Sequence, residues 1–268
     1  MVRTLARAIW ILVALALCSC VAGPVNPSFP LGAAEAHQAI ERMRQDPKKL
    51  PHPLVIVGGF ADPDILPQLL KSFFGGITQD TRIIPVSMGL CHSFEQCRER
   101  VIDAVDDAVP SADPNWTSEV DVVGLSLGGL VARYCAAPSR DPRHPRRLRI
   151  AQLFTISSPH SGAALAKTVG LTQFHRDMMP GSEFLQYLSR FDAQASYRLV
   201  AYVHLDDEIV GDTHAAPAGQ NVYWLANDAP FFPHLGAMLD RRILADIARR
   251  LRGEAPFTLS PPAPLPPG

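Results

Sequence analysis

The sequence predicts a single α/β domain with a mainly parallel sheet and helices on both faces. Apolar segments that resemble buried strands alternate with segments of helical character, as in parallel sheets whose strands are joined by helices. A chain of 268 residues with 47% hydrophobic and 19% charged residues can bury one sizeable core. A G-x-S-x-G motif at residues 124–128 follows one of the apolar segments directly and precedes a small-residue helix.

The elements are expected in the following order. Buried strands are predicted near residues 54–57, 82–86, 120–123, 148–156, 198–204 and 221–226. The clearest helices are predicted at residues 94–109, 127–136 and 236–251. The main domain is therefore expected to cover residues 51–254.

The first twenty residues resemble an export signal of the lipoprotein type. Two arginines precede an apolar run at residues 8–17, which is too short to span a bilayer as a mature helix. The run leads into L-C-S-C, which resembles the lipobox of bacterial lipoproteins, with Cys20 as the lipidated residue. Cys18 fits less well because the large Leu17 precedes it. We expect an exported protein, anchored in a membrane of the cell envelope through Cys20 or secreted after simple cleavage, with residues 21–50 as spacer and lead-in.

The predicted export bears on the other cysteines. Cys91 and Cys97 lie six positions apart at the start of a predicted helix, and an oxidising compartment would allow a disulfide between them if their geometry fits. Cys135 is expected as a buried free thiol. The spacing of cysteine and histidine does not resemble a zinc site, so we expect no metal.

The motif at residues 124–128 predicts a nucleophile elbow. A β-branched segment at residues 119–123 precedes the motif, which puts Ser126 on a turn from strand to helix. Glycines on both sides of the serine allow strand and helix to approach closely. The alternative is a chance turn. Because a serine hydroxyl is a weak nucleophile, the elbow predicts a carboxylate and a histidine base later in the chain.

Asp207 and His234 are the predicted acid and base. Three acids follow the predicted strand at residues 198–204, and Asp207 is chosen because its spacing to Ile209 and Val210 resembles the D-x-I-V pattern of lipases. Asp206 is the alternative. His234 follows the last predicted strand and lies on a loop before the terminal helix. His214 lies too close in sequence to Asp207 to be its partner.

With these residues in place, the chain resembles the lipase and esterase branch of the α/β-hydrolase family over most of its mature length. The resemblance is carried by residues 124–134, by residues 155–162, by the segment around Asp207 and by the H-L-G sequence at His234. It implies the α/β-hydrolase fold. In such enzymes the stretch at 155–162 shapes the site without supplying a triad member, so we interpret His160 as structural.

The resemblance also implies an oxyanion hole formed by two backbone N–H groups. One belongs to Leu127, the residue after the nucleophile, and the other to Phe60, in the loop after the first core strand. Gly58 stands where lipases usually have histidine, which bears on the rigidity of this loop. The alternative for the loop is a plain β-turn.

Members of this family insert a helical cap where this chain has its longest connection. The cap is expected at residues 163–196, between the strands at 148–156 and 198–204. Its apolar residues either line an acyl pocket or pack on the sheet, and the sequence leaves both open. They are Phe174, Met178, Met179, Phe184, Leu185, Tyr187 and Leu188.

Two further segments have an unusual composition, one rich in arginine and one rich in proline. The arginine-rich stretch at residues 140–149 is interpreted as a solvated loop, with contact to anionic lipid headgroups as the alternative. Residues 255–268 are rich in proline and are expected to form a disordered tail. The net charge of −1 provides no field that would recruit nucleic acid.

The predicted function is hydrolysis of carboxylic esters through Ser126, His234 and Asp207 and an acyl-enzyme intermediate, without a cofactor. The expected partners are an ester or lipid substrate and, through Cys20, a membrane. An acyltransferase or thioesterase with the same triad is one alternative. A catalytically silent lipoprotein that uses the fold as a binding module is another.

Overall fold

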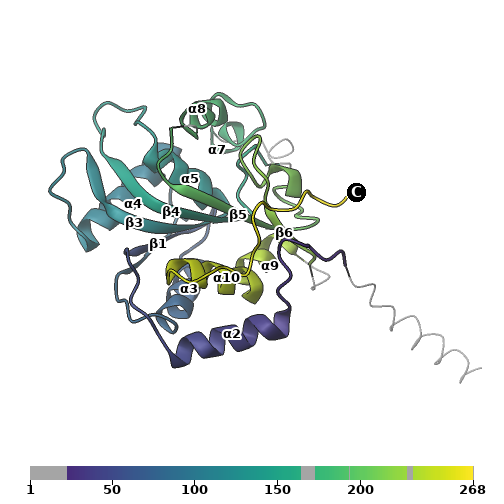
Figure 1. The fold of residues 1–268 in the computed structure, drawn as a ribbon. Coiled ribbons are helices and arrows are strands. Elements are labelled where there is room, and N and C mark those ends of the chain that lie inside the picture. Colours follow the sequence, from purple (N-terminus) through teal and green to yellow (C-terminus); the bar gives the residue numbers. More distant parts are fainter. Residues whose placement is uncertain (1–22, 164–172, 193, 228–231, 268) are drawn as a thin grey trace, which may run out of the picture.

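A six-stranded parallel sheet forms the centre of the protein (Figure 1). The computed structural model describes residues 23–163, 173–192, 194–227 and 232–267. The strand order is β2-β1-β3-β4-β5-β6, with every neighbouring pair parallel. The strands are β1 (Leu54–Val57), β2 (Ile83–Val86), β3 (Trp116–Leu125), β4 (Arg147–Ile156), β5 (Arg198–His204) and β6 (Tyr223–Leu225).

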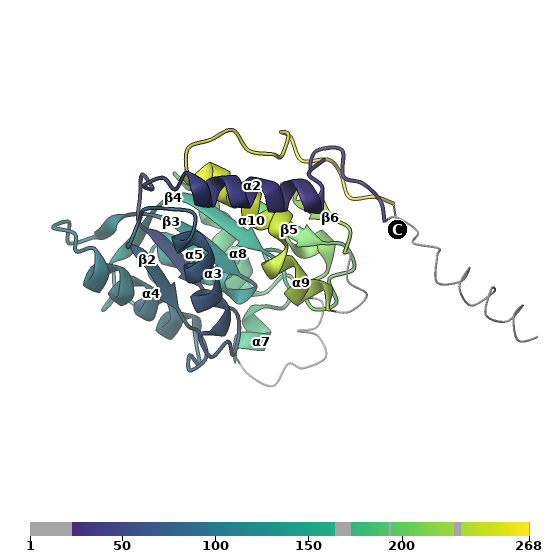
Figure 2. The same ribbon diagram turned by 90° about the horizontal axis from the view of Figure 1, so that it is seen from below.

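Helices cover both faces of the sheet, which confirms the predicted α/β class. Those on one face are α2 (Ala33–Gln45), α3 (Ile65–Gly75), α9 (Pro233–Leu239) and α10 (Arg241–Leu251). Those on the other are α4 (Phe94–Ala108), α5 (Leu127–Ala136), α7 (Gln173–Asp177) and α8 (Glu183–Asp192). Figures 1 and 2 show α2 outside α10 on its face of the sheet. A short 3-10 helix, η1 (Asp212–His214), follows β5.

Alternating side chains of the strands explain the two layers. In β1, Leu54 and Ile56 pack into the core with α2, α3 and α10, while Val55 and Val57 pack into the core with α4 and α5. All four are fully buried. A strand that is apolar on both faces is expected in a parallel sheet covered on both sides.

The end of the domain differs from the single helix predicted at residues 236–251. The structure has two helices, α9 and α10, that meet at Asp240. Asp240 has extended backbone angles, and its side chain accepts a hydrogen bond from the Arg242 amide at the start of α10. Aspartate competes for amide donors in this way and therefore favours helix starts over helix interiors.

The proline-rich tail is ordered along the sheet edge, so the predicted disorder is wrong for residues 256–267. Thr258 is buried and donates to the carboxylate of Asp246 on α10. Farther along, the Pro264 carbonyl accepts a hydrogen bond from the indole of Trp224 in β6. Proline lacks the backbone N–H that helices and sheet ladders use, but its carbonyl still accepts hydrogen bonds, and the sequence reasoning overlooked these acceptors.

The chain before α2 also packs against the edge of the sheet, so the stretch predicted as spacer and lead-in (residues 21–50) is part of the domain from residue 23 onward and not a free spacer. Phe29 is buried against the rings of Tyr202 and Tyr223. The Ser28 carbonyl accepts a hydrogen bond from the Leu259 amide, which joins this segment to the tail. Figures 1 and 2 show the two segments side by side. Cys20 and the predicted signal lie outside the described residues.

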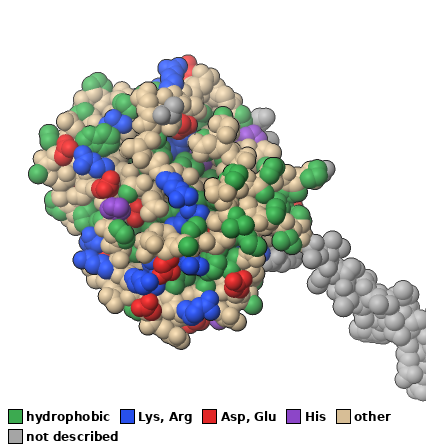
Figure 3. Space-filling view, in the orientation of Figure 1, with side chains coloured by type: hydrophobic (Ala, Val, Ile, Leu, Met, Phe, Trp, Pro, Cys, Tyr) green, Lys and Arg blue, Asp and Glu red, His purple; other side chains and the backbone are tan. Residues whose placement is uncertain are grey.

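The arginine-rich stretch is largely neutralised within the protein. Arg143, Arg146 and Arg149 each form an ion pair with an aspartate. Arg147 donates to a carbonyl at the end of α5 and lies over the ring of Trp116. Basic and acidic side chains are interspersed on the face in Figure 3. Within the described ranges, no helix is long and apolar enough to cross a membrane.

Cys91 and Cys97 are free thiols in the structure, so the disulfide for which their spacing allowed is not formed. Both are buried, as is Cys135. Burial disfavours the thiolate and raises the pKa of Cys97 and of Cys135. Cys135 is a buried free thiol, as predicted.

Candidate active site

Ser126 occupies the turn between β3 and α5, at the carboxyl end of the central strands. Its backbone angles are φ 50° and ψ −120°, a strained conformation for a residue with a side chain. The turn is tight because Gly124 lies against the backbone of Gly129, where an added Cβ would come within 2.6 Å of the Cα atom. The sequence therefore forms the elbow that the motif predicted.

Backbone strain in the described residues is concentrated at this end of the sheet. Positive φ angles at non-glycine residues occur in the loop after β1, at the elbow, directly after β4, after β5 and directly before α9. These residues are Ala61, Asp64, Ser126, Ser157, Asp206 and Phe232. Such conformations cost free energy and cluster at functional sites, where the surrounding structure holds them in place.

The structure brings Ser126, His234 and Asp207 into one hydrogen-bonded line. Nε2 of His234 lies 3.1 Å from Oγ of Ser126. Nδ1 of the same imidazole lies 3.0 Å from each carboxylate oxygen of Asp207. The histidine side chain is 10% exposed, while that of the aspartate is fully buried. This is the geometry in which a base can take the serine proton while a carboxylate orients the base.

Asp207 is held by the loop in which it lies. Its Oδ1 accepts hydrogen bonds from the amides of Ile209 and Val210, at 3.1 and 2.9 Å. Burial alone would raise the pKa of the Asp207 carboxyl, but the hydrogen bond and charge of His234 and the Val210 amide together hold it below its ordinary value. The carboxyl is therefore ionised at neutral pH. Asp206, the alternative acid, is exposed and has no hydrogen bond to His234 among those described.

Glu208 has a role that the sequence reasoning missed. Its carboxylate accepts a hydrogen bond of 3.1 Å from the backbone N–H of His234, which lies in the first turn of α9. The first amides of a helix have no partner within the helix, and a carboxylate there also interacts favourably with the helix dipole. The sequence showed three acids in a row after a predicted strand, but it did not show that two of them would bind His234.

The two residues predicted to supply the oxyanion hole, Leu127 and Phe60, both line the cavity beside Ser126. Leu127 is the first residue of α5, so its N–H points out of the helix without an intrahelical acceptor. The loop after β1 packs directly on the elbow, because a Cβ added to Gly59 would lie 3.4 Å from Cβ of Ser126. Phe60 follows at once, and its side chain is one wall of the cavity at Ser126.

A cavity of about 700 Å³ opens beside Ser126 and His234 and is largely apolar. Besides the catalytic candidates, it is lined mainly by α3, α9 and the loop after β1. Several of its apolar residues are about half exposed at the mouth: Phe60, Ile65, Leu69, Leu235 and Leu239. A cavity of this volume accommodates an extended apolar ligand.

The described part of the predicted cap contributes mainly to the core and less to the lining of the cavity at Ser126. Phe174, Phe184 and Leu188 are buried in the core layer that contains α4 and α5. Met178 is buried there as well and also reaches the cavity at Ser126. Residues 164–172 of the predicted cap lie outside the described residues.

His160 has the structural place that was expected. It is buried, with Nε2 2.9 Å from Oγ1 of Thr155 and Nδ1 3.1 Å from the guanidinium of Arg133. Burial and the nearby guanidinium hold the pKa of His160 well below its ordinary value, so the ring is neutral at pH 7. Arg133 in turn binds both carboxylate oxygens of Asp192 at the end of α8.

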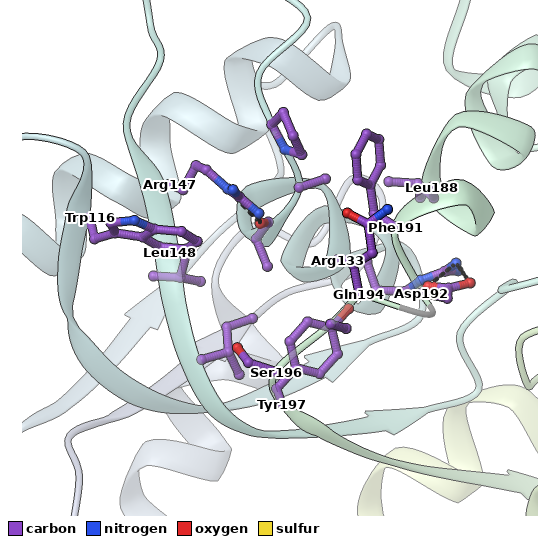
Figure 4. A pocket seen from close by; sticks show the side chains of 15 residues that line it. Trp116, Arg133, Arg147, Leu148, Leu188, Phe191, Asp192, Gln194, Ser196 and Tyr197 are labelled. Atoms are coloured by element: carbon purple, nitrogen blue, oxygen red, sulfur yellow. Dashed lines mark hydrogen bonds and ion pairs between the residues drawn. The ribbon is translucent and has the colours of Figure 1, made fainter.

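The Arg133–Asp192 pair lines a second, smaller cavity that does not include Ser126. This cavity of about 280 Å³ lies between the end of α5, the first half of β4 and α8 (Figure 4). The close-up shows the pair at one side and Trp116 with Arg147 at the other. The ion pair therefore fastens the cap helix α8 to the helix that follows the nucleophile.

One group of described residues has ligand atoms close enough together for a metal. Those of Glu99, Asp141 and His144 lie within 4.8 Å of one another. However, the carboxylate of Asp141 already accepts four hydrogen bonds from Arg143, two on each oxygen. The group is an ion-pair cluster on the surface, away from Ser126.

Part of the chain matches a protein-family model. Residues 91–191 match a family described as "Putative serine esterase (DUF676)". The matched segment contains Ser126 and ends before Asp207 and His234, and it covers less than half of the chain. A comparison with curated proteins gave no match.

Comparison with solved structures finds matches at low sequence identity. The lipase BlEst2 of Bacillus licheniformis in its propeptide form has a TM-score of 0.48 and 12% identity, over 81% of this chain and 52% of that one. The phospholipase PlaB of Legionella pneumophila has a TM-score of 0.47 and 12% identity, over 77% and 59%. A metagenomic carboxyl esterase has a TM-score of 0.41 and 14% identity, over 77% of each chain.

The chain thus spans little more than half the length of the first two structures. The sheet order, the parallel strands and the elbow after β3 are those of the predicted α/β-hydrolase fold.

Proposed function

We propose that this protein is a serine hydrolase that cleaves carboxylic esters with a long acyl chain. The observation that carries the proposal is the hydrogen-bonded line from Asp207 through His234 to Ser126, which ends on a strained elbow beside an apolar cavity. The match of residues 91–191 to a serine esterase family supports the reaction type.

The reaction would proceed in two steps. His234 takes the proton of Ser126 as Oγ attacks the ester carbonyl, and Asp207 stabilises the imidazolium that forms. The amides of Leu127 and Phe60 donate to the oxygen that becomes negative, and the amino terminus of α5 adds a favourable dipole. The same histidine then protonates the leaving alcohol. Water repeats the sequence on the acyl-enzyme and releases the acid.

The preference for a long acyl chain follows from the cavity. Its lining between α3 and α9 is apolar from the neighbourhood of Ser126 out to Leu69 and Leu239 at the surface. An acyl chain that leaves water for such a surface gains about 0.8 kcal/mol for each buried CH₂ group. Successive CH₂ groups should therefore raise kcat/KM until the cavity is filled.

The test is hydrolysis of p-nitrophenyl esters of increasing acyl length by the purified protein, with Ser126→Ala as control. Activity that rises with chain length and disappears in the variant is the expected result. Equal activity in Ser126→Ala would refute the serine mechanism, and a short-chain optimum would refute the acyl preference. Acyl transfer to an added alcohol or thiol, measured in the same mixtures, tests the transferase alternative, and hydrolysis of an acyl thioester tests the thioesterase alternative. No turnover of any ester or thioester would favour the binding module.

We further propose that Cys20 carries a lipid anchor and that the protein acts at a membrane of the cell envelope. The support is the lipobox-like sequence that precedes the described chain. Cys20→Ser should move the protein from the membrane fraction to the soluble fraction when cells are fractionated. Membrane retention of this variant would contradict the anchor.

A further inference from the structure

A second histidine–carboxylate pair lies beside the triad candidates. His204, the last residue of β5, has its Nε2 2.8 Å from Oδ2 of Asp240. The two side chains are only 4% and 8% exposed. Burial would raise the pKa of Asp240, but hydrogen bonds from His204 and Arg242 lower it to about 2. Asp240 is therefore a carboxylate and accepts the Nε2 proton of His204.

This pair joins the same two segments that carry the acid and the base. His204 lies three residues before Asp207, and Asp240 lies six residues after His234. At about 1.5 Å of rise per residue, six residues of α9 correspond to about 9 Å. A single hydrogen-bonded contact between the two segments would let α9 rotate about that contact. Two contacts about 9 Å apart along α9 fix the direction of the helix as well.

Asp240 is itself held from several sides. It accepts hydrogen bonds from the backbone N–H and the guanidinium of Arg242, at 2.8 and 2.6 Å. The guanidinium also donates to the carbonyl of Ala226, directly after β6. On the other side, the backbone of α9 lies on the His204 ring, since a Cβ added to Gly236 would be 3.5 Å from its Nδ1. The pair therefore connects β5 and the end of β6 to the junction of α9 and α10.

We propose that His204 and Asp240 are positioning residues that hold α9 so that the imidazole of His234 stays in line with Asp207 and Ser126. The proposal rests on the ester hydrolase function proposed above. His204 does not touch the reacting atoms and acts only through the helix. A base displaced by about 1 Å can cost on the order of 100-fold in rate, so a loosened α9 should appear in kcat while substrate binding in the cavity is retained.

A neighbouring bond provides a matched control. Tyr202 lies two residues before His204 on β5, and its hydroxyl donates to Asp246 on α10 at 2.7 Å. Residues two apart on a strand face the same side. Tyr202→Phe thus removes a buried bond from the same strand to the same helical layer, but not one at the end of α9.

The test compares His204→Leu, His204→Gln and Tyr202→Phe with the wild type. Leucine removes the donor, whereas the glutamine amide can donate to Asp240 from near the position of Nε2. We expect His204→Leu to lower kcat about 10- to 100-fold with little change in KM, and His204→Gln to restore most of that loss. Tyr202→Phe should lower Tm without a comparable loss of kcat.

The second readout does not depend on turnover. The proton that His234 Nδ1 shares with Asp207 should give a low-field proton NMR resonance in the wild type, in His204→Gln and in Tyr202→Phe, and a broadened or lost one in His204→Leu. The proposal is overturned if His204→Leu keeps this resonance, or if its kcat falls no more than that of Tyr202→Phe. Should the wild type hydrolyse no ester, the proposed function fails, and the resonance still tests the positioning role.

Discussion

Replacing Asp207 with asparagine removes a charge from a fully buried position and changes few contacts. In the structure, Oδ1 of Asp207 accepts two backbone amides, from Ile209 and Val210. An asparagine in the same place keeps its oxygen on those amides, because only oxygen can accept them. Its NH₂ group then replaces Oδ2, one of the two oxygens that lie 3.0 Å from Nδ1 of His234. A donor at that position requires an unprotonated Nδ1, so the ring proton moves to Nε2, where it blocks acceptance of the serine proton.

With His234 in the wrong tautomer, we expect a large loss of kcat and only a small loss of folding stability. A buried triad aspartate replaced by asparagine typically costs about 10⁴-fold in kcat. At about 1.36 kcal/mol per factor of ten, this corresponds to about 5 kcal/mol of transition-state stabilisation. The KM should change little, because Asp207 does not line the cavity at Ser126.

The assay is kcat and KM on a p-nitrophenyl ester, with circular dichroism to show that the variant is folded. Asp206→Asn is the matched control, since Asp206 is exposed and has φ 61°, a conformation that asparagine tolerates as well as aspartate. Its kcat should stay within about twofold of the wild type, as for most exposed positions. Equal losses in the two variants, or a folded Asp207→Asn that retains about a tenth of the wild-type rate, would refute the acid assignment.

Three other substitutions or truncations test separate parts of the structure. Leu69→Glu places a charge at the half-exposed mouth of the cavity. The loss of an apolar contact worth about 2 kcal/mol should lower kcat/KM for a long-chain ester about 30-fold and leave kcat/KM for the acetyl ester unchanged. Equal effects on both esters would contradict the assignment of this cavity to the acyl chain. Burial raises the pKa of Asp121, so the unfolded chain releases this proton at a lower pH than the folded protein, and wild-type stability is lost as pH rises through the raised pKa. In urea denaturation Asp121→Asn should therefore gain stability relative to the wild type as the pH rises above about 3.8, the ordinary pKa of an aspartate, and a difference independent of pH would exclude this explanation. Removing residues 256–268 takes away the hydrogen-bond donors of Phe257 and Thr258 to the buried Asp246. The truncation should lower the free energy of unfolding by about 2 to 4 kcal/mol. An unchanged urea midpoint would show that the tail contributes nothing to stability.

Local patterns in the sequence were enough to predict the architecture and the nucleophile. Apolar segments of strand length, separated by helical segments, predict a parallel sheet because each strand is buried on both faces. The elbow is local too, since Gly124 and Gly128 permit at Ser126 a turn that other residues would obstruct. The expected order of acid and base then narrowed the search to a few residues beyond strand ends.

Contacts between distant parts of the chain decided the rest. Asp206 and Asp207 are chemically identical neighbours, and only the turn after β5 sends one to His234 and the other to solvent. From sequence the tail was predicted to be disordered, because its order comes from tertiary partners, such as Asp246 on α10 and Trp224 in β6, and not from a local pattern. The split of the last helix at Asp240 and its bond to His204 likewise depend on long-range packing. A sequence pattern reports the preferences of a short segment, whereas hydrogen-bond partners are selected by the packing of the whole fold.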